Sequence, residues 1–394
     1  MLGLGLESMD IMFLSFVLST IIAEFGISSA AGGSIASITN IGMLLGGVIF
    51  GILADKYGRI RVFSYTILLF AVATALMVFA NNIYVIYFLR FLAGVGAGGE
   101  YGIGMALVAE VYSRKKLGKM TSWVTIGGQA GAIAAAILAA IIIPLFGWRA
   151  LFAVGVLPVF LVLYIRKNLD ETEEWKKTQV EMKAKGKRGN PLVKLFDSPK
   201  TAYVTIALTI MSTVQVAGYF GLMNWIPSIL QQQLGLSVSG SSLWMISTIL
   251  GMCAGMFLFG RILDRFGAKV SYSIFLIASA ASVFLYVFAQ SPITILIGGT
   301  IVGFFANGMN AGYGALISSF YPTEVRSTAN NAIFNTGRAL GGLSPIAIGF
   351  LLDQFGLTAA MAFLSILYII SLTVILTLRG VPLKGVKHHE AAGE

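Results

Sequence analysis

Long apolar runs separated by short polar loops make up most of this chain. Twelve windows are each apolar over roughly the 20 residues that a helix needs to cross a bilayer. They lie at about 2–24, 31–54, 61–80, 84–112, 120–145, 148–168, 201–231, 237–262, 270–289, 292–320, 327–354 and 357–379. The pattern predicts an all-α membrane protein with twelve transmembrane helices.

The composition excludes a pair of water-soluble domains. Hydrophobic residues make up 57% of the 394 residues and charged ones only 11%, whereas a soluble domain carries about 25% charged residues. The one cysteine, Cys253, cannot form an internal disulfide. The chain enters its first apolar window without the basic segment of a signal peptide. We expect its natural leader to be missing or very short.

A phrase that occurs twice divides the chain into similar halves. Residues 51–62 read GILADKYGRIRV and residues 260–270 read GRILDRFGAKV. Each copy follows an apolar window and has an acid, a base, a glycine and further basic residues in the same order. Parallel repeats of six helices are one construction of secondary transporters. We therefore predict a six-helix bundle in 1–168, a linker in 169–200, a second bundle in 201–379 and a tail in 380–394.

The positions of the basic residues predict the topology. All but three of the 27 Lys and Arg lie after even-numbered windows or in the tail, the exceptions being Arg90, Arg149 and Arg338. Because cytoplasmic loops are enriched in Lys and Arg, both termini are expected in the cytoplasm and the protein in the cell (inner or plasma) membrane. The net charge of +10 then reflects topology and not nucleic-acid binding. The linker is expected to be a solvated connection without a function of its own, part of it an amphipathic helix with Trp175 at the membrane surface.

The repeated phrase resembles the loop between helices two and three of the major facilitator superfamily. Gly51, Leu53, Asp55, Lys56, Gly58, Arg59 and Arg61 fit the pattern G-x-L-x-D-R/K-x-G-R-R/K, and the second copy has Ala268 where an Arg would stand. The resemblance covers the whole chain and implies two six-helix bundles that work by alternating access. It also implies that loop charges hold the halves together as gating latches: Asp55, Arg59, Glu110, Arg114, Asp264, Arg265, Glu324 and Arg326.

Further phrases resemble the metabolite and organic-acid proton symporters of that superfamily. They are RFLAGVGAGGEYGIGMALVAE (90–110), GYFGLMNWIPSIL (218–230), YPTEVRSTA (321–329) and NTGRALGGLSP (335–345). The Gln pair of sugar porters in helix seven and the helix-five proline of drug antiporters are both missing. The resemblance implies proton-coupled uptake of a small organic anion, a carboxylate. A sugar or polyol symporter, a drug antiporter and a non-transporting membrane receptor stay open as alternatives.

Ionisable residues inside the apolar windows are candidates for proton coupling, because such groups are costly in a bilayer. Glu7 and Asp10 share one face of the first window, and Arg90 and Glu100 lie in the fourth. Asp10 and Arg90 are predicted to form the coupling pair. Counting about 1.5 Å per residue from the outer helix ends nevertheless places Asp10 deeper than Arg90 by roughly 10 Å. Glu7 and Glu100 match better in depth, so either of them could carry the proton.

Arg338 is the candidate ligand for a substrate carboxylate, which a guanidinium binds with two parallel hydrogen bonds. Asn331, Asn335 and Arg338 follow i, i+4, i+7 and form one polar stripe. Alternatively, Arg338 pairs with Glu7 or Asp10 across the halves, or binds a backbone carbonyl. Further polar or aromatic candidates for the substrate site are Asn310, Tyr313, Gln215, Tyr219 and Trp225.

The sequence shows no sign of an enzyme. The GVGAGG phrase at 94–99 lies within an apolar window and lacks the Lys-Ser/Thr that follows a phosphate-binding loop. The two histidines, His388 and His389, lie in the tail, and the chain has no paired Cys/His spacing for a metal. We therefore expect no cofactor and no metal. The expected partners are the organic anion, the proton and the lipid bilayer, with no nucleic acid and the protein a monomer.

Overall fold

A computed structural model describes residues 1–394 apart from 28, 185–190, 235–237, 290 and 381–394. His388, His389 and nearly all of the tail therefore lie outside the described residues. The described α-helices are α1 (Leu2–Phe25), α2 (Ser29–Tyr57), α3 (Arg59–Leu76), α4 (Ile83–Val111), α5 (Leu117–Ala153), α6 (Leu157–Asn168), α7 (Glu173–Ala184), α8 (Pro199–Leu234), α9 (Val238–Phe266), α10 (Ala268–Ser282), α11 (Leu285–Phe288), α12 (Pro292–Val302), α13 (Tyr313–Phe320), α14 (Arg326–Gly341) and α15 (Ser344–Thr377). Short 3₁₀ segments are η1 (Met77–Phe79), η2 (Arg114–Lys116), η3 (Val154–Val156), η4 (Val193–Leu195), η6 (Met309–Gly312) and η7 (Thr323–Val325), and η5 (Gly303–Asn307) is a π-helix.

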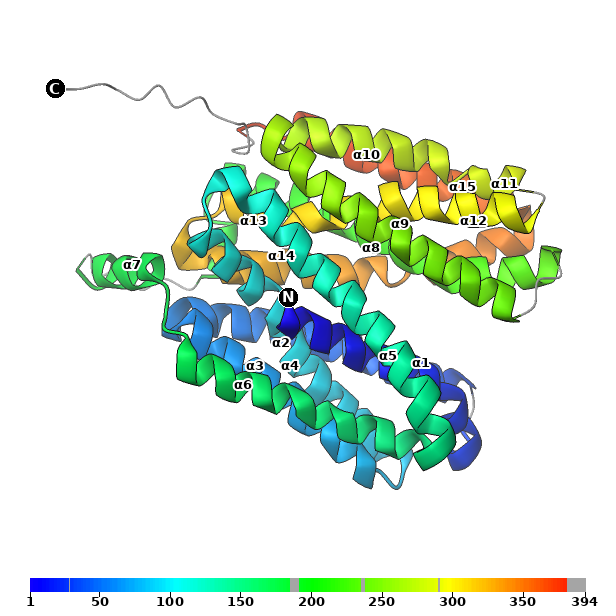
Figure 1. Ribbon diagram of the computed structural model, residues 1–394. Coiled ribbons are helices and arrows are strands. Elements are labelled where there is room, and N and C mark those ends of the chain that lie inside the picture. Colours follow the sequence, from blue (N-terminus) through cyan, green and yellow to red (C-terminus); the bar gives the residue numbers. More distant parts are fainter. Residues whose placement is uncertain (28, 185–190, 235–237, 290, 381–394) are drawn as a thin grey trace.

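The helices form two groups with matching turns. Figure 1 shows α1–α4 and α6 in the lower group and α8–α15 in the upper one, with α5 running from beside the upper group into the lower one. Gly58 and Gly267, the glycines of the repeated phrase, have positive φ angles of 118° and 81°. Gly147 bends α5 and Gly356 bends α15, with φ angles of 77° and 78°. Both pairs are 209 positions apart in sequence, so each half turns sharply at corresponding points, where glycine adopts the left-handed backbone without strain.

Spans ten and eleven are interrupted where the sequence predicts single helices. In the tenth, α12 is followed by η5, η6 and then α13. In the eleventh, α14 ends at Gly341 and α15 begins at Ser344. The break in the eleventh span has a local cause, since Pro345 has no backbone N–H to continue the helix.

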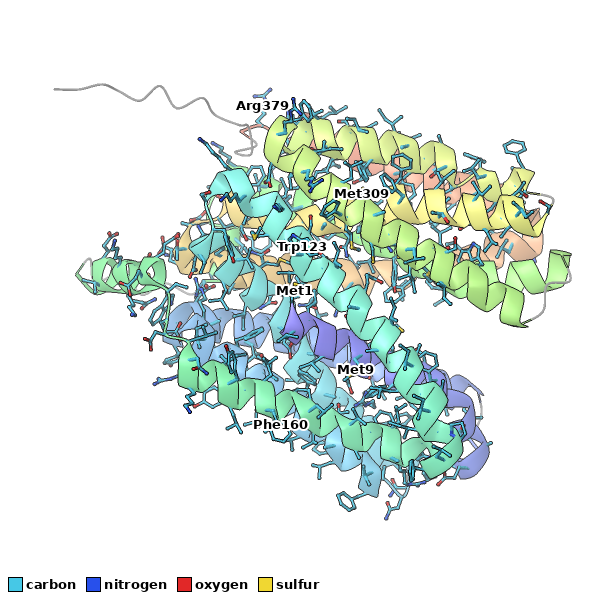
Figure 2. The ribbon with its side chains drawn as sticks, in the orientation of Figure 1. Met1, Met9, Trp123, Phe160, Met309 and Arg379 are labelled. Carbon is cyan, nitrogen blue, oxygen red and sulfur yellow. The ribbon has the colours of Figure 1, made fainter. Side chains whose placement is uncertain are left out.

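The outer faces of both groups are apolar. Large side chains such as Phe79, Phe160 and Ile297 are exposed, Phe160 by 65% (Figure 2). Within the described residues, nine helical stretches are long and apolar enough to cross a membrane, and one of them, Leu117–Ile165, has 49 residues. That length is sufficient for two crossings. Apolar residues that are exposed to this extent fit a lipid-facing surface.

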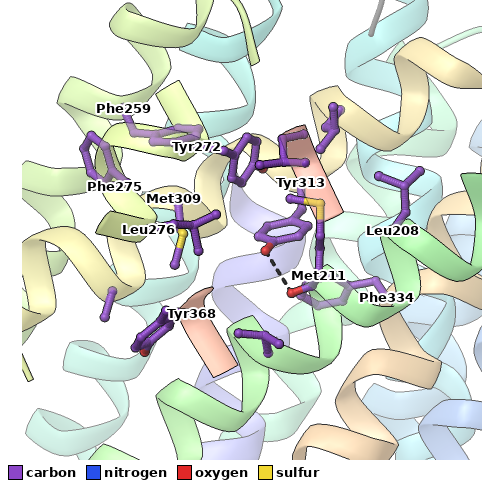
Figure 3. Close-up of a cluster of buried hydrophobic side chains, with 14 of the residues drawn as sticks. Leu208, Met211, Phe259, Tyr272, Phe275, Leu276, Met309, Tyr313, Phe334 and Tyr368 are labelled. Carbon is purple, nitrogen blue, oxygen red and sulfur yellow. Dashed lines mark hydrogen bonds between the residues drawn. The ribbon is translucent and has the colours of Figure 1, made fainter. Parts of the chain in front are cut away.

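The interior of the second half is rich in aromatic side chains. Figure 3 shows Phe259, Tyr272 and Phe275 packed together, and Tyr313 close to them. The rings of Phe259 and Tyr272 lie 4.9 Å apart, and those of Tyr272 and Tyr313 lie 5.3 Å apart. The Tyr313 hydroxyl donates a hydrogen bond of 2.9 Å to the Met211 carbonyl. This core fixes η6 and α13 against α8, α9 and α10.

The aspartates of the two repeated phrases join the halves. Asp55 accepts hydrogen bonds from the backbone N–H groups of Ser327 and Thr328, at the start of α14. Asp264 accepts them from Gly118 and Lys119, at the start of α5. The donors are also 209 positions apart, so the two contacts are related by the internal repeat. A carboxylate at a helix N-terminus binds free N–H groups and the positive end of the helix dipole. We call this end of the molecule the linker side.

The linker contacts both halves instead of standing free. Glu171 accepts hydrogen bonds from the backbone of Ile60 and Arg61 at the start of α3. The Trp175 indole, expected at the membrane surface, donates to the Asp55 carbonyl. Glu174 pairs with Arg326 of the second half at 3.0 Å. The linker therefore bridges the two groups of helices at the linker side.

Candidate functional site

A cavity of ≈ 170 Å³ lies between the two halves. Its polar lining consists mainly of neutral amides, hydroxyls and one guanidinium. From the first half these are Ser8, Asn40, Tyr101, Thr125 and Gln129, and from the second half Gln215, Tyr219, Asn307, Asn310 and Arg338. Such a wall provides hydrogen bonds for a small polar molecule and a single positive charge for an anion.

Arg338 lies at the wall of this cavity, with a carboxylate from the other half beside it. Its Nη1 is 3.4 Å from Oε1 of Glu7, which belongs to α1. The same nitrogen is 3.1 Å from the Met43 sulfur, and the guanidinium lies 5.5 Å from the centre of the Phe334 ring. Of the alternatives for Arg338, pairing with Glu7 across the halves is the one present here. At 3.4 Å this contact is longer than the usual charge-assisted hydrogen bond.

Asp10 and Arg90 form a closely packed ion pair. The two guanidinium nitrogens lie 3.2 and 3.3 Å from the two carboxylate oxygens. The Thr74 hydroxyl donates to Asp10 at 2.6 Å and accepts from Arg90 at 2.8 Å. Counting residues gave a depth difference of roughly 10 Å between Asp10 and Arg90. The two charged groups are nevertheless in direct contact. The count treats the outer helix ends as level and omits the length of the arginine side chain.

Glu7 and Glu100 are buried but differ from Asp10 in their partners. Glu7 has one oxygen near Arg338 and the other without a hydrogen-bond partner among the described residues. Glu100, on α4, is 2% exposed, and neither of its oxygens has a partner there. Glu100 does not line the central cavity.

Span ten presents two amides, those of Asn307 and Asn310, to the cavity at the point where its helix is interrupted. Gln215 donates to the Ala306 carbonyl at 3.0 Å and to the Asn307 side-chain oxygen at 2.9 Å. Ala306 and Asn307 belong to the π-helix η5, and π-helical turns are frequent at functional sites. The side-chain oxygen of Asn310 has no partner among the described residues. It is therefore available to a ligand.

Three of the substrate-site candidates do not line the cavity. Asn331 accepts from the Gly102 backbone N–H at 2.8 Å, and Asn335 donates to the Gly98 carbonyl at 2.9 Å. Both amides are buried against α4, so they join the halves by hydrogen bonds. Tyr313 is part of the aromatic core described above. The side chain of Trp225 lies outside the described residues.

Sequence reasoning missed several cavity residues of the first half. Asn40, Tyr101 and Gln129 line the cavity, and the Tyr101 ring stacks on Phe334 with centroids 3.9 Å apart. Polar residues inside apolar windows were the available signal. This signal alone does not separate a cavity wall from a helix contact, because neutral polar residues inside spans also join helices by hydrogen bonds.

The latch candidates whose side chains are described lie at the linker side, but only some of them contact the opposite half. Arg59 pairs with Asp55 at 2.7 Å and with Glu110 at 3.0 Å, and it donates to the Thr323 carbonyl of the second half. Arg326 lies 4.0 Å from Glu110. The remaining candidates behave differently: Glu324 pairs with Lys194 at 2.5 Å, Arg265 is exposed against the Phe266 ring, and the Arg114 side chain lies outside the described residues.

Two bundles of membrane-spanning helices around a polar cavity, joined through equivalent aspartates, define a secondary transporter. The sequence matches the family model described as Major Facilitator Superfamily over residues 1–254 and 208–394. The chain belongs to this superfamily. It is a multi-pass membrane transporter with the twelve-helix fold, and not an enzyme.

The chain is similar to proteins that are named as metabolite transporters. A Haemophilus influenzae protein named for metabolite transport is 39% identical over 373 residues, covering 94% of this chain and 92% of that protein. The cis,cis-muconate transport protein of Acinetobacter baylyi is 30% identical over 355 residues, covering 89% and 85%. Among solved structures, the proton:xylose symporter XylE has a TM-score of 0.77 at 18% identity, covering 95% of this chain and 93% of that one. At that identity the likeness concerns the fold alone.

Proposed function

We propose that this transporter takes up a small organic anion, a carboxylate, together with a proton. The observation that carries the proposal is Arg338 at the cavity wall, 3.4 Å from Glu7 of the opposite half. A guanidinium at this position provides the two parallel donors that a carboxylate needs. The muconate transporter among the relatives supports an anion as the substrate.

Competition for Arg338 couples the proton to the substrate. Without substrate, the Glu7 carboxylate neutralises the guanidinium. A proton on Glu7 removes that negative charge and frees Arg338 for the substrate carboxylate. Proton and anion then favour each other's binding, because each stabilises the state that the other needs. The loaded site carries no net additional charge across the membrane.

Asp10 and Arg90 hold the proton site in place. Asp10 lies three residues after Glu7 on α1, so the two side chains share one face. Its two oxygens are occupied by Arg90 and Thr74, which fixes α1 against α3 and α4. This geometry favours Glu7 over Asp10 as the group that exchanges the proton. The Asp10–Arg90 pair then holds α1, and with it Glu7, in position.

Uptake requires an orientation, which the basic residues supply. The linker side carries most of the Lys and Arg and is assigned to the cytoplasm of a cell membrane by the positive-inside rule. Apart from Glu7–Arg338 at the cavity, the charged contacts between the halves described above lie at this side. The polar cavity is lined from α1, α2, α4, α5, α8 and α14. This arrangement favours a state that opens outward.

A proton-coupled sugar or polyol symporter is the second candidate. The specific observation in its favour is the number of neutral amides around the cavity, including Asn40, Gln129, Gln215, Asn307 and Asn310. Amides pair with hydroxyl groups as readily as with carboxylates. The two candidates differ in what Arg338 does, since a neutral sugar does not need its charge.

Thermal stability of the purified protein with added ligands separates the candidates, because a ligand that binds the folded state raises its stability. The panel consists of cis,cis-muconate, benzoate and N-acetylneuraminate as carboxylates and D-xylose as the neutral sugar. We expect at least one carboxylate to raise the melting temperature of the wild type, and Arg338→Lys to weaken its binding by about 1.5–3 kcal/mol, the contribution of a charged hydrogen bond. If xylose stabilises the protein and none of the carboxylates does, the sugar or polyol symporter replaces the organic-anion symporter as the proposed function.

A further inference from the structure

Glu100 is the one acid among those in α1 and α4 described above that has no polar partner. Asp10 is paired with Arg90, and Glu7 lies beside Arg338. Both oxygens of Glu100 are buried, with no hydrogen-bond partner in the described part of the chain. A carboxylate without a counter-ion is costly in the membrane interior, and acids in such positions mark proton relays.

Glu100 faces a second cavity, of ≈ 390 Å³, that is distinct from the central one. Its lining includes Leu2 in the first turn of α1 and Val108 near the end of α4, so it lies toward the linker side. Phe63, Met105 and Ile165 contribute apolar walls. Among the described residues that line it, Glu100 carries the only ionisable side chain, and the α-amino group of Met1 is the other ionisable group. The space exceeds by far the 10–15 Å³ or so that one water molecule needs. The polar partners that a water also needs belong to three lining residues, namely the Glu100 carboxylate, the Tyr101 hydroxyl and the Met1 α-amino group.

A thin partition separates the two cavities. Leu4 and Tyr101 are the only residues among the described linings that border both. Tyr101 directly follows Glu100 in α4, and its ring is stacked on Phe334 from the second half. Glu100 packs against the start of α1, where a Cβ added to Gly3 would lie 3.5 Å from its Oε2. Glu7 and Asp10 of α1 are the charged side chains whose field acts on it. Glu100 therefore lies between the proposed proton site and a space at the linker side that the substrate cavity does not include.

We propose that Glu100 is the exit station for the coupled proton, so that proton and substrate leave the protein by different routes. Resting on the proposed function, the step transfers a proton from the Glu7 carboxylic acid to the Glu100 carboxylate, directly or through water. Glu7 is left as a carboxylate that pairs again with Arg338, which expels the substrate anion. Glu100 then gives its proton to water in the second cavity, and its own carboxylate is restored.

Proteoliposomes that contain a pH-sensitive dye test this proposal with the panel carboxylate that stabilises the wild type most, supplied in radiolabelled form. Exchange of labelled for unlabelled carboxylate needs no net proton release, whereas net uptake does. Glu100→Gln is expected to retain exchange and to lose net uptake by about 100-fold, the scale of removing a positioned proton-transfer group. Glu100→Asp should restore net uptake in part. Met105→Leu, in the same cavity, is the matched control and should leave both rates unchanged.

Internal pH gives the second readout. Raising it should accelerate net uptake by the wild type, because an alkaline interior draws the proton from Glu100, and Glu100→Gln should lose this dependence. Unchanged net uptake in Glu100→Gln overturns the exit station while the proposed function stands. Loss of exchange together with net uptake also overturns it, because the role is then structural. If the wild type transports the carboxylate without moving protons, the proposed function itself fails.

Discussion

Replacing Asp55 by Asn should open the linker side of the transporter. The Asp55 carboxylate accepts hydrogen bonds of 3.2 and 2.8 Å from the backbone N–H groups of Ser327 and Thr328, and one of 2.5 Å from the Thr328 hydroxyl. All three cross between the halves. They must break when this side opens, and the 2.7 Å ion pair with Arg59 holds the carboxylate in place for them.

The size of the effect follows from what Asn cannot provide. Asn keeps one acceptor oxygen, loses the negative charge at the start of α14, and directs an NH₂ group toward backbone N–H donors. A hydrogen bond to a charged group contributes about 1.5–3 kcal/mol. Since 1.4 kcal/mol is a factor of ten, losing one such bond should raise the ratio of linker-side-open to closed molecules by about 10- to 150-fold. Arg59 keeps Glu110 as a partner, so no unpaired charge is left behind.

Cysteine labelling measures this ratio. Ser122 is buried at the contact between α5 and α9, against Gly260 of the other half, and is distant in sequence from Asp55. A Ser122→Cys reporter in a Cys253→Ser background should react slowly with N-ethylmaleimide in the parent and faster in the Asp55→Asn variant. The matched control is Glu173→Gln, an exposed acid paired with Lys176 of its own helix. Equal labelling rates in the parent and Asp55→Asn would refute the reasoning.

Three further predictions concern packing, binding and topology. Gly102→Ala should lower the melting temperature, because a Cβ there would lie 2.2 Å from the Asn331 side-chain oxygen and overpacking costs about 1–3 kcal/mol. In the control Gly104→Ala, the atom nearest to the added Cβ is 4.0 Å away. Equal melting temperatures of the two variants would contradict this prediction. Asn310→Ala should weaken carboxylate binding in the thermal-shift assay and leave the melting temperature without ligand almost unchanged. Asn331→Ala should lower the melting temperature without ligand. If Asn331→Ala instead weakens binding without lowering that temperature, Asn331 belongs to the substrate site. A cysteine that replaces the exposed Glu181 should not react with an impermeant reagent added outside intact cells. Rapid labelling would show that the linker lies outside the cell and would contradict the predicted topology.

Much of the architecture is encoded in local patterns that a sequence displays directly. The apolar windows predict the fold class, and the family match and the helices confirm it. The repeated phrase indicates two related halves, because its Asp and Gly recur at one offset. The repeated phrase does not show which residues its aspartates contact. Nothing near Ser327 or Gly118 in the sequence indicates that an aspartate of the other half binds the start of that helix, because these contacts form only when the two halves meet.

The site was harder to predict, because helical periodicity defines a face but not what lies opposite. Asn331, Asn335 and Arg338 do share a face of α14, yet the two amides meet the glycines of α4 while Arg338 reaches the cavity. Pairing of Arg338 with Glu7 or Asp10 was one of several open alternatives, because nothing in the sequence gives the distance between helices in different halves. The π-helical turn η5 that presents Asn307 likewise has no clear sequence signal.

The central claim, that Glu7 and Arg338 couple a proton to a carboxylate, is tested most directly by proton movement. Wild-type protein and the variants Glu7→Gln, Asp10→Asn and Arg338→Ala are reconstituted into vesicles with an internal pH dye, and the best-binding panel carboxylate is added outside. The wild type should acidify the interior as substrate enters, and Glu7→Gln should exchange substrate without any acidification. Arg338→Ala should do neither. If Glu7→Gln acidifies the vesicles like the wild type while Asp10→Asn does not, the proton site lies at Asp10, one turn further along α1; if both do, the coupling account is wrong.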